Sequence, residues 1–302
     1  MTNFLNNIFD KRDKPISESS RKLYIRNLEK MNDNKEVTNV KFLQDTSRII
    51  SGISKYKPTT QRSFIISICT VLKNNDDKLY QFYFELLSKM NNDLKVNVEK
   101  TDKQKANWID QSEINNIFNE LKKKATSNKN KNKEGFDKVL NYLVLSLYTL
   151  NMAPRRNIDY TLMKVSSDMT DTNFNYIDLQ KKTFIFNNYK TQGKYNEVAV
   201  EINDDLLQVV YLYLKFHPDS KKLKNKKYDF HFLVNSNGDP IDKSQSMTTI
   251  LNKIFNKKIG SSMLRNMYLT NKYGAMMQEM KQDVKTMSTS VDVAMNNYIK
   301  QD

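Results

Sequence analysis

The sequence has 302 residues, which is more than one compact core usually holds, so two domains are expected. Hydrophobic residues make up 38% and aromatic residues 11%, which is enough to build a core in each. The formal net charge of +15 favours a polyanionic partner, most commonly nucleic acid, although an AT-rich genome would also enrich lysine through codon usage. The single cysteine, Cys69, excludes a disulfide framework and a cysteine-based zinc site.

The sequence contains neither a secretory signal peptide nor a stretch long enough to span a membrane. Charged residues occur too early in the first twelve positions for a secretory signal peptide. The longest apolar stretch, Val139 to Leu150, is too short to cross a bilayer and is expected to be a buried helix. We therefore expect an intracellular protein with no membrane partner.

The first ninety residues predict a small all-helical domain behind a loose N-terminal arm. Residues 1–17 are Asn-rich and basic and are expected to be irregular, and a helix is expected from Ser17, where Ser and Glu supply capping chemistry. Further helices are expected over 40–53, from Pro58 to Leu72 and over 77–90, each with an apolar side. This helical domain is assigned to residues 1–95.

The polar, charged residues 96–107 have the composition of a linker, and a second domain is assigned to residues 108–302. Its predicted elements begin with a helix capped near Asp110, followed by a mobile Lys/Asn loop over 122–134 and the apolar helix ending at Leu150. Pro154 is expected to be the first residue of a new helix that includes Arg155 and Arg156.

The period of the apolar pattern then changes to that of strands. Residues 174–180, 183–189 and 197–202 carry alternating and β-branched residues, which predicts a small three-stranded antiparallel sheet. Gly193 is expected to form the turn between the second and third strands. Helices are expected over 204–216 and 245–255 and through the C-terminal segment, so the fold is mainly α, with a mixed α+β second domain.

Two lysine-rich loops stand out, at 122–133 and 220–227. Such loops are most often simply solvated, but both could also lie along a nucleic-acid backbone.

The residue types needed for transesterification at a phosphate are present at four places. Such a reaction needs a nucleophile, cations for the non-bridging oxygens and an acid for the leaving oxygen. Tyr298 offers the nucleophile. Arg155-Arg156, Lys190 and Arg265 offer the cations, and arginine suits phosphate because its planar fork is always charged.

This order of residues resembles the tyrosine recombinase, or phage-integrase, family over nearly the whole chain. The segment 154–164 looks like the family's first-arginine helix in the register that selects Arg156, with Asp159 as the acid that follows it by three and Arg155 as the alternative. The segment 176–194 looks like its hairpin with the catalytic lysine at Lys190. Ser262-Met263-Leu264-Arg265 matches the His-x-Leu-Arg box at Leu and Arg, and 287–298 matches the Leu-Gly-His-Ser…Tyr box in spacing.

The resemblance departs from the family at both histidine positions, which are Ser262 and Thr289 here. The two histidines of the chain, His217 and His231, fall elsewhere. Both hydroxyls can donate to a phosphate oxygen, but neither can hold a proton near neutral pH. The resemblance therefore implies a catalytic set of Arg156, Lys190, Arg265 and Tyr298 assisted by Ser262 and Thr289, with slower chemistry than a histidine-bearing relative.

What the resemblance implies is a site-specific recombinase or integrase of a mobile element, plausibly a virus or virophage, acting in the host cytoplasm or nucleus or in a virion. It implies an α-helical core-binding domain before a catalytic domain, double-stranded DNA as substrate, self-assembly on DNA as a dimer or tetramer, and a 3′-phosphotyrosyl intermediate formed without metal or cofactor. Two alternatives stay open: a non-catalytic or weakly active DNA-binding relative, and a type IB topoisomerase-like enzyme that relaxes DNA.

Overall fold

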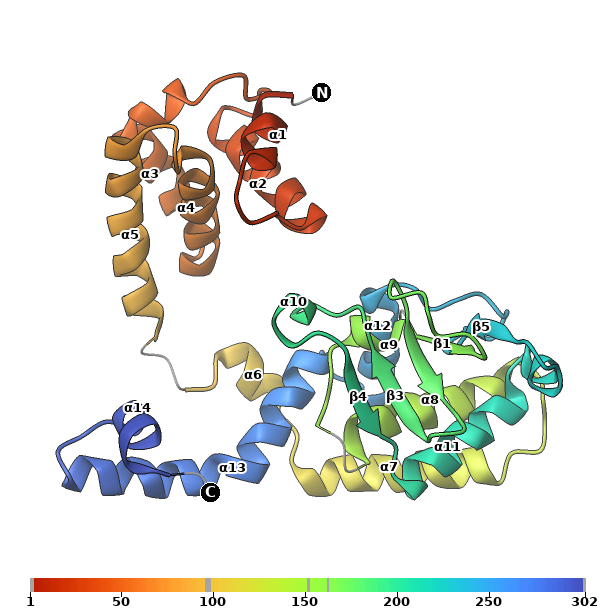
Figure 1. The fold of residues 1–302 in the computed structure, drawn as a ribbon. Coiled ribbons are helices and arrows are strands. Elements are labelled where there is room, and N and C mark those ends of the chain that lie inside the picture. The colour runs from red at the N-terminus through yellow and green to blue at the C-terminus, as the bar shows by residue number, and fades with distance from the viewer. Residues whose placement is uncertain (1–2, 96–98, 151–152, 162, 301–302) are drawn as a thin grey trace. The chain divides into compact units, whose positions relative to one another are not determined.

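The computed structural model describes residues 3–95, 99–150, 153–161 and 163–300. It divides into two compact units, Met1–Glu99 and Lys100–Asp302, each described by itself (Figure 1). In the described part of the chain no helix is both long and apolar enough to cross a membrane.

The N-terminal unit is helical and packs around α4. Its elements are α1 (Asn3–Asp10), α2 (Glu18–Met31), a short 3-10 helix η1 (Lys41–Gln44), α3 (Thr46–Ser54), α4 (Pro58–Leu72) and α5 (Asp77–Lys95). The other four α-helices all contact α4, because most of the apolar side chains in its second half are fully buried. Ser17 caps α2 by accepting from the backbone N–H of Ser20 at 3.3 Å, which confirms the predicted start of that helix.

Two expectations for this unit are wrong. The arm expected over residues 1–17 contains α1, whose Leu5 and Phe9 are 0% and 1% exposed and join the core. Apolar residues four apart lie on one helix face, and their burial outweighs the Asn-rich composition. The helix expected over 40–53 is divided into η1 and α3, because the Asp45 side chain accepts from the N–H of Arg48 and so begins a new helix.

The helices of the C-terminal unit begin within the expected linker. They are α6 (Asp102–Asn107), α7 (Gln111–Thr126), α8 (Lys133–Thr149), α9 (Asn157–Thr161), α10 (Gln192–Tyr195), α11 (Asp204–Phe216), the 3-10 helix η2 (Ser220–Lys224), α12 (Ser244–Phe255), α13 (Ser261–Thr286), α14 (Val291–Val293) and a π-helical turn η3 (Ala294–Tyr298). Asp110 caps α7 as predicted. The loop expected over 122–134 is shorter, since α7 continues to Thr126 and α8 begins at Lys133.

The sheet of this unit has five strands rather than the three expected. The strands are β1 (Met163–Ser166), β2 (Asn175–Asp178), β3 (Thr183–Phe186), β4 (Val198–Glu201) and β5 (Asp229–His231), in the order β4-β3-β2-β1-β5. β1 and β2 are parallel and the other pairs antiparallel, so the sheet is mixed. The two additional strands are β1, whose first two residues fall in the segment 154–164 expected to be helical, and β5, whose three residues are too few for a period to be recognised.

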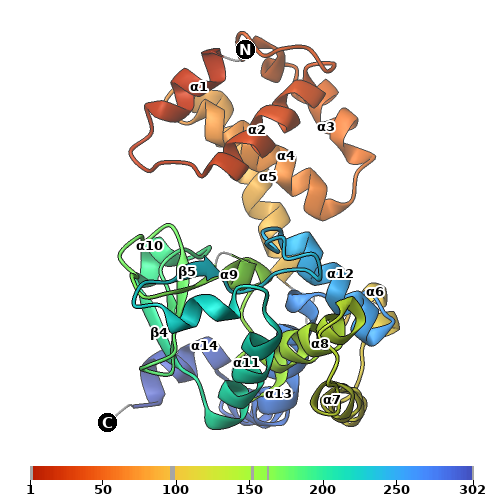
Figure 2. The same ribbon diagram turned by 90° about the vertical axis from the view of Figure 1, so that its right-hand side faces the viewer.

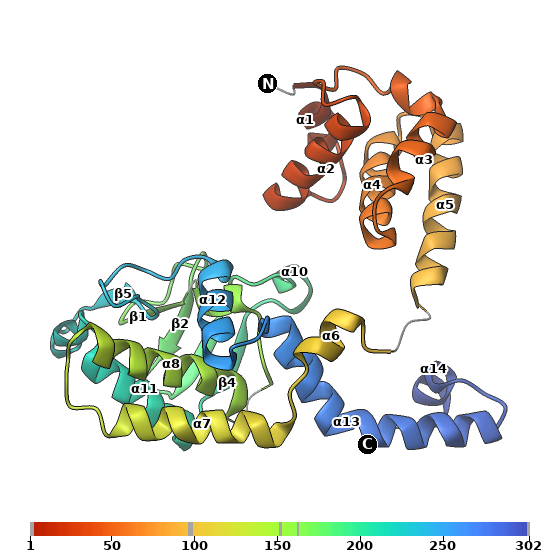
Figure 3. The ribbon, with the colours of Figure 1, turned by 180° about the vertical axis from the view of Figure 1, so that it is seen from behind.

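The layers of the unit place helices on one face of the sheet. Figures 1 and 3 show α8 and α11 against that face, and Figure 2 shows α7 beyond α8, on the side away from the strands. α8 is the centre of the core, since Val139, Leu143, Val144, Leu145 and Leu147 are all 0% exposed.

Two local expectations near the predicted hairpin are also wrong. The helix expected to include Arg155 and Arg156 begins only at Asn157, so both arginines precede α9. Gly193 lies inside α10 and forms no turn. The chain instead turns at Asn196, which adopts a positive φ of 54° just before β4.

Candidate active site

Asn157, the first residue of α9, connects four helices. Its side-chain oxygen accepts from the Tyr148 hydroxyl of α8 at 2.6 Å, and its amide nitrogen donates to Ser244 O at 3.0 Å and Thr248 Oγ1 at 2.9 Å in α12. Its backbone N–H donates to Ser261 Oγ, in the first residue of α13, at 3.4 Å. Asn157 is 4% exposed. The bonds from one buried residue therefore fix the start of α9 against the start of α13.

This junction brings three of the predicted site residues together. Arg156 directly precedes Asn157, and Ser262 directly follows Ser261. Arg265 is four residues after Ser261, which places it one turn further along the same face of α13. Arg156 and Arg265 are both partly exposed, and Ser262 is exposed. One arginine that precedes α9, and a hydroxyl and a second arginine of α13, therefore lie around one junction.

The structure distinguishes the two adjacent arginines. Arg155 Nε donates to Asp159 Oδ2 at 3.0 Å, and its guanidinium lies 3.7 Å from the centre of the Phe186 ring. The motif register associates Asp159 with Arg156, but the ion pair is made by Arg155. In the described part of the chain the Arg156 side chain has no hydrogen bond or ion pair. Arg155 is thus held by the fold, whereas Arg156 is available to a ligand.

Asp159 is a costly group to bury. It is 2% exposed, and burial raises the pKa of its carboxyl, an effect opposed first by the charge of Arg155 and then by its hydrogen bond. Its second oxygen, Oδ1, has no hydrogen-bond partner among the described residues. The carboxylate therefore depends on Arg155 for its compensation.

A buried asparagine in β2 fixes the loop that carries Lys190. Asn175 is 0% exposed, and its amide nitrogen donates to Asp159 O at 2.7 Å and to Asn188 O at 3.0 Å. Its oxygen accepts from the N–H groups of Asn187 and Asn188, both at 2.8 Å. One side chain thus joins α9 to the end of β3.

Lys190 itself is an exposed residue at the end of this loop. The preceding residue, Tyr189, has its ring centre 5.2 Å from the Arg155 guanidinium, so the loop returns to the arginine pair. The Lys190 side chain makes no hydrogen bond or ion pair in the described part of the chain, and its reach is unrestricted.

The proposed nucleophile lies elsewhere. α13 has 26 residues, a length of about 39 Å along its axis, and it changes direction part-way along (Figures 1 and 3); Arg265 lies near its beginning. Figures 1 and 3 show α14 at the opposite end of α13, away from the sheet. Thr289 follows α13 and donates its N–H to Val284 O at 2.8 Å, and Tyr298, at the end of η3, is 61% exposed. The structure brings Arg156, Ser262 and Arg265 to one junction and places Lys190 on a loop next to Arg155, whereas Thr289 and Tyr298 follow the far end of α13.

Both histidines belong to the packing of β5 and α11. His217 is 2% exposed, its Nδ1 accepts from the N–H of Asp219 at 3.0 Å, and its Nε2 lies 3.1 Å from His231 O. Since Nδ1 accepts, Nε2 must donate, which fixes a neutral tautomer. Burial lowers the pKa of His217 to about 4.

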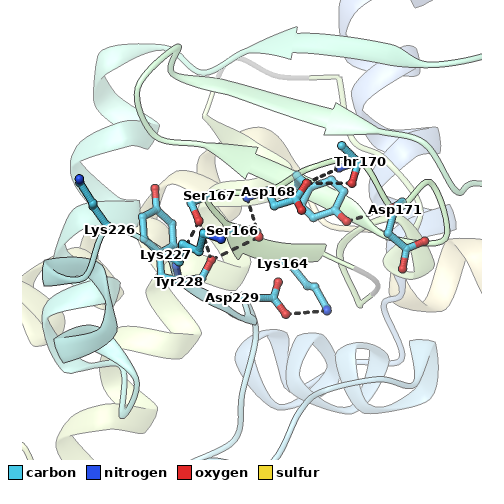
Figure 4. Close-up of a pocket in the computed structure, with 11 residues that line it drawn as sticks. Lys164, Ser166, Ser167, Asp168, Thr170, Asp171, Lys226, Lys227, Tyr228 and Asp229 are labelled. Atoms are coloured by element: carbon cyan, nitrogen blue, oxygen red, sulfur yellow. Dashed lines mark hydrogen bonds and ion pairs between the residues drawn. The ribbon is translucent and has the colours of Figure 1, made fainter.

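Of two cavities in the C-terminal unit, one adjoins the junction between Asn157 and Ser261 and the other contains none of the predicted site residues. The first, of about 550 Å³, has Lys103, Lys258, Asn252, Ser261 and Ser262 in its walls. The other, of about 660 Å³, lies beside β1 and β5 (Figure 4). One pair of its charges is satisfied within the cavity, by the Lys164–Asp229 ion pair at 2.9 Å.

Asn157 and Asn175 were missed by the sequence interpretation. Their signal was an amide next to aromatic or apolar residues, as in Phe174-Asn175-Tyr176, where a buried polar side chain must have partners.

No family model and no curated protein matches the sequence. Among solved structures, one titled "Crystal structure of XerA recombinase" matches with 14% sequence identity and a TM-score of 0.36, covering 90% of this chain and 84% of that chain. A likeness of this degree decides neither family nor activity, and the tyrosine recombinase resemblance stays a prediction.

Proposed function

We propose that the chain binds double-stranded DNA and that its C-terminal unit breaks and rejoins a DNA strand through Tyr298. The observation that carries the proposal is the bond from the N–H of Asn157 to Ser261 Oγ, because it places Arg156 beside the turn of α13 that bears Arg265. Neither arginine has a hydrogen-bond or ion-pair partner among the described residues, and two such arginines at one junction suit the non-bridging oxygens of a phosphate. The net charge of +15 is consistent with that ligand.

In the proposed reaction, the Tyr298 hydroxyl gives up its proton to solvent as its oxygen bonds to phosphorus, and the bond from phosphorus to the 5′ oxygen breaks. Arg156 and Arg265 bind the non-bridging oxygens, where charge develops. Lys190 donates a proton to the departing 5′ oxygen, a role that its exposed, unpaired ammonium permits. Ser262 donates a hydrogen bond to the same phosphate, and Thr289 approaches it together with Tyr298.

The length of α13 sets a condition on this chemistry. We infer that Tyr298 meets the arginines if α13, already bent in Figures 1 and 3, bends further or unwinds, or if a second copy of the chain supplies the tyrosine. We propose that the active state is an assembly on DNA, a dimer or a tetramer, in which this condition is met.

The test is a covalent adduct on nicked DNA. The full chain is incubated with a pool of nicked duplexes of randomised sequence, in which the fragment beyond the cleaved bond diffuses away and traps the phosphotyrosyl bond. An adduct that survives detergent is expected from the unaltered protein and from Tyr211→Phe, a control tyrosine that is 42% exposed. It should be absent from Tyr298→Phe, and an adduct that persists there overturns the assignment of the nucleophile.

A second candidate function, DNA binding without strand transfer, is favoured by the separation of Tyr298 from the arginines. It predicts that no adduct forms with any variant, whereas Arg156→Ala and Arg265→Ala still weaken duplex binding. That outcome refutes strand transfer and retains the binding site.

A further inference from the structure

Two lysine-rich segments that are far apart in the sequence meet at one end of the C-terminal unit. The first is the loop between α7 and α8, with Lys129, Lys131 and Lys133. The second is η2 and the residues after it, with Lys221, Lys224, Lys226 and Lys227. All seven side chains are exposed, and we call them together the distal lysine surface.

Direct contacts join the two segments to neighbouring parts of the fold. Lys131 Nζ lies 6.0 Å from the centre of the ring of Phe216, the last residue of α11, which leads into η2. Lys133 Nζ donates to Asn237 Oδ1 at 3.4 Å. Figures 1 and 3 both show the loop between α7 and α8 and the end of α11 on the side of the unit away from α13.

The surface has few opposing charges. In the described part of the chain none of its seven lysines forms an ion pair. Two nearby acids are used by other lysines, since Asp219 pairs with Lys222 and Glu134 pairs with Lys138, and Asp168 is the acid that Lys227 influences electrostatically. Figure 4 shows where the surface ends: Lys226 and Lys227 lie at one side of the cavity, and Asp168 and Asp171 lie at the other. Like charges gathered without counterions oppose folding, and an anionic ligand would relieve that repulsion.

The surface lies at the opposite end of α8 from the candidate active site. Lys133 is the first residue of α8, and Tyr148, fifteen residues later, holds Asn157 at the site. Fifteen residues of helix span about 22 Å. That length corresponds to about six base-pair steps of duplex DNA at 3.4 Å each. A phosphate at the arginine junction and a phosphate at the lysines are therefore different phosphates.

We propose that the distal lysine surface is a second contact with the backbone of double-stranded DNA, at least about six base pairs from the contact made by Arg156 and Arg265. Lysine ammonium groups act as point charges on phosphates and read no base edges. Neither segment contains an aromatic residue between its lysines, so it offers no platform for stacking unpaired bases. The surface therefore fits a duplex backbone, bound without regard to sequence. This inference requires DNA as the ligand and does not require strand transfer.

The test is the salt dependence of duplex binding by the full chain, measured by fluorescence anisotropy with a labelled 30-base-pair duplex. Two triple variants remove three charges from each segment: Lys129→Gln, Lys131→Gln, Lys133→Gln in one, and Lys221→Gln, Lys224→Gln, Lys227→Gln in the other. A matched control removes three charges elsewhere, through Lys181→Gln, Lys281→Gln and Lys285→Gln, all exposed. Equal midpoints of thermal unfolding show that the variants remain folded.

Each phosphate contact contributes about 0.9 to the slope of log affinity against log salt. The magnitude of that slope should fall by about 2 to 3 in each surface variant and by less than about 1 in the control. If the surface variants behave like the control, the proposal is wrong. If they bind DNA like the control but are no longer retained by immobilised poly-glutamate, the partner is an acidic protein and the proposal is equally wrong.

Two further experiments ask whether both contacts lie on the same duplex, and whether the lysine surface and the proposed active site can fail independently. In a titration far above the dissociation constant, one duplex per chain shows that both contacts lie on the same duplex, and two per chain show that the surface binds another. The same triple variants made with Arg156→Ala and Arg265→Ala should lose the same slope. If the arginine changes leave binding and adduct formation unaltered while the lysine changes act, the proposed active site fails and the distal lysine surface stands.

Discussion

Replacing Asn157 by alanine is the sharpest test of the junction at the candidate active site. The change removes the acceptor of the Tyr148 hydroxyl, in a residue that is 3% exposed, and two donor bonds to α12. An orphaned buried hydroxyl costs roughly 1–3 kcal/mol and each lost neutral hydrogen bond about 1 kcal/mol. We therefore expect the free energy of unfolding of the C-terminal unit to fall by about 3–4 kcal/mol.

The Tyr148→Phe change turns this expectation into a double-mutant cycle. Alone it leaves Asn157 Oδ1 without its donor and should cost about 2 kcal/mol. Made together with Asn157→Ala it removes the orphaned hydroxyl, so the double variant should be no less stable than Asn157→Ala alone. The expected coupling is therefore about 2 kcal/mol.

The chain provides its own probe for this experiment. Trp108 is the single tryptophan, and it packs against the core of the C-terminal unit. Its fluorescence during urea unfolding reports on that unit separately from the helical N-terminal unit. Effects of the two substitutions that simply add in the double variant would refute the reasoning, because they would show that Tyr148 and Asn157 do not depend on one another.

Three further predictions concern other parts of the molecule. Arg155→Ala should destabilise the C-terminal unit by about 3–5 kcal/mol in urea unfolding, because it leaves the buried Asp159 carboxylate without its ion-pair partner. Arg156→Ala should change stability by less than about 0.5 kcal/mol and slow adduct formation by about 10²–10³-fold. Similar stabilities for the two variants would contradict this prediction. The pKa of the His217 imidazole is lower in the folded state than in the unfolded state. Its neutral form therefore contributes about 3 kcal/mol to the free energy of unfolding above about pH 6.5, and this contribution is lost as the pH falls toward 4. The stability difference between the unaltered protein and His217→Gln should shrink over that range in unfolding titrations, and a constant difference would contradict it. Phe9→Ala should destabilise the N-terminal unit by about 3–5 kcal/mol in circular dichroism melts, and Phe82→Ala, at a ring that is 43% exposed, by much less.

The sequence predicted those elements whose information is local. The start of α2 at Ser17 and the cap of α7 at Asp110 followed from side chains that bond to their own helix. β1 and β5 did not follow, because β1 begins inside the segment expected to be helical, the three residues of β5 have no readable period, and both strands pair with strands elsewhere in the chain. α1 was missed because composition was given more weight than the apolar pair Leu5 and Phe9.

The candidate site shows the same division. The motifs selected Arg156, Lys190, Ser262 and Arg265, and the fold brings the elements that carry the arginines and the serine to one junction and places Lys190 on a loop next to Arg155. The motifs left the choice between the two arginines open, because it depends on Phe186 and on the burial of Asp159, neither of which is adjacent to them in a readable pattern. The motifs gave no distance between Arg265 and Tyr298, since a spacing of 33 residues (298 − 265) is compatible with a compact turn or with one long helix.

The middle of α13 has a mechanical consequence. Its buried residues are Met263, Leu264 and Met267 near the beginning and Val284 near the end, so no described residue between them is buried in the core, and the Asn271 side chain donates to Gln111 Oε1 of α7 at 3.4 Å. A bare stretch of helix of that length is marginal in water, and Gly274 at its centre lowers its propensity by about 1 kcal/mol relative to alanine. The length of this segment therefore depends on its helix–coil equilibrium. Unwinding one turn there would redirect everything beyond it, so the reach of Tyr298 is a thermodynamic variable that temperature, helix-promoting solvents or a single Gly274→Ala change can adjust.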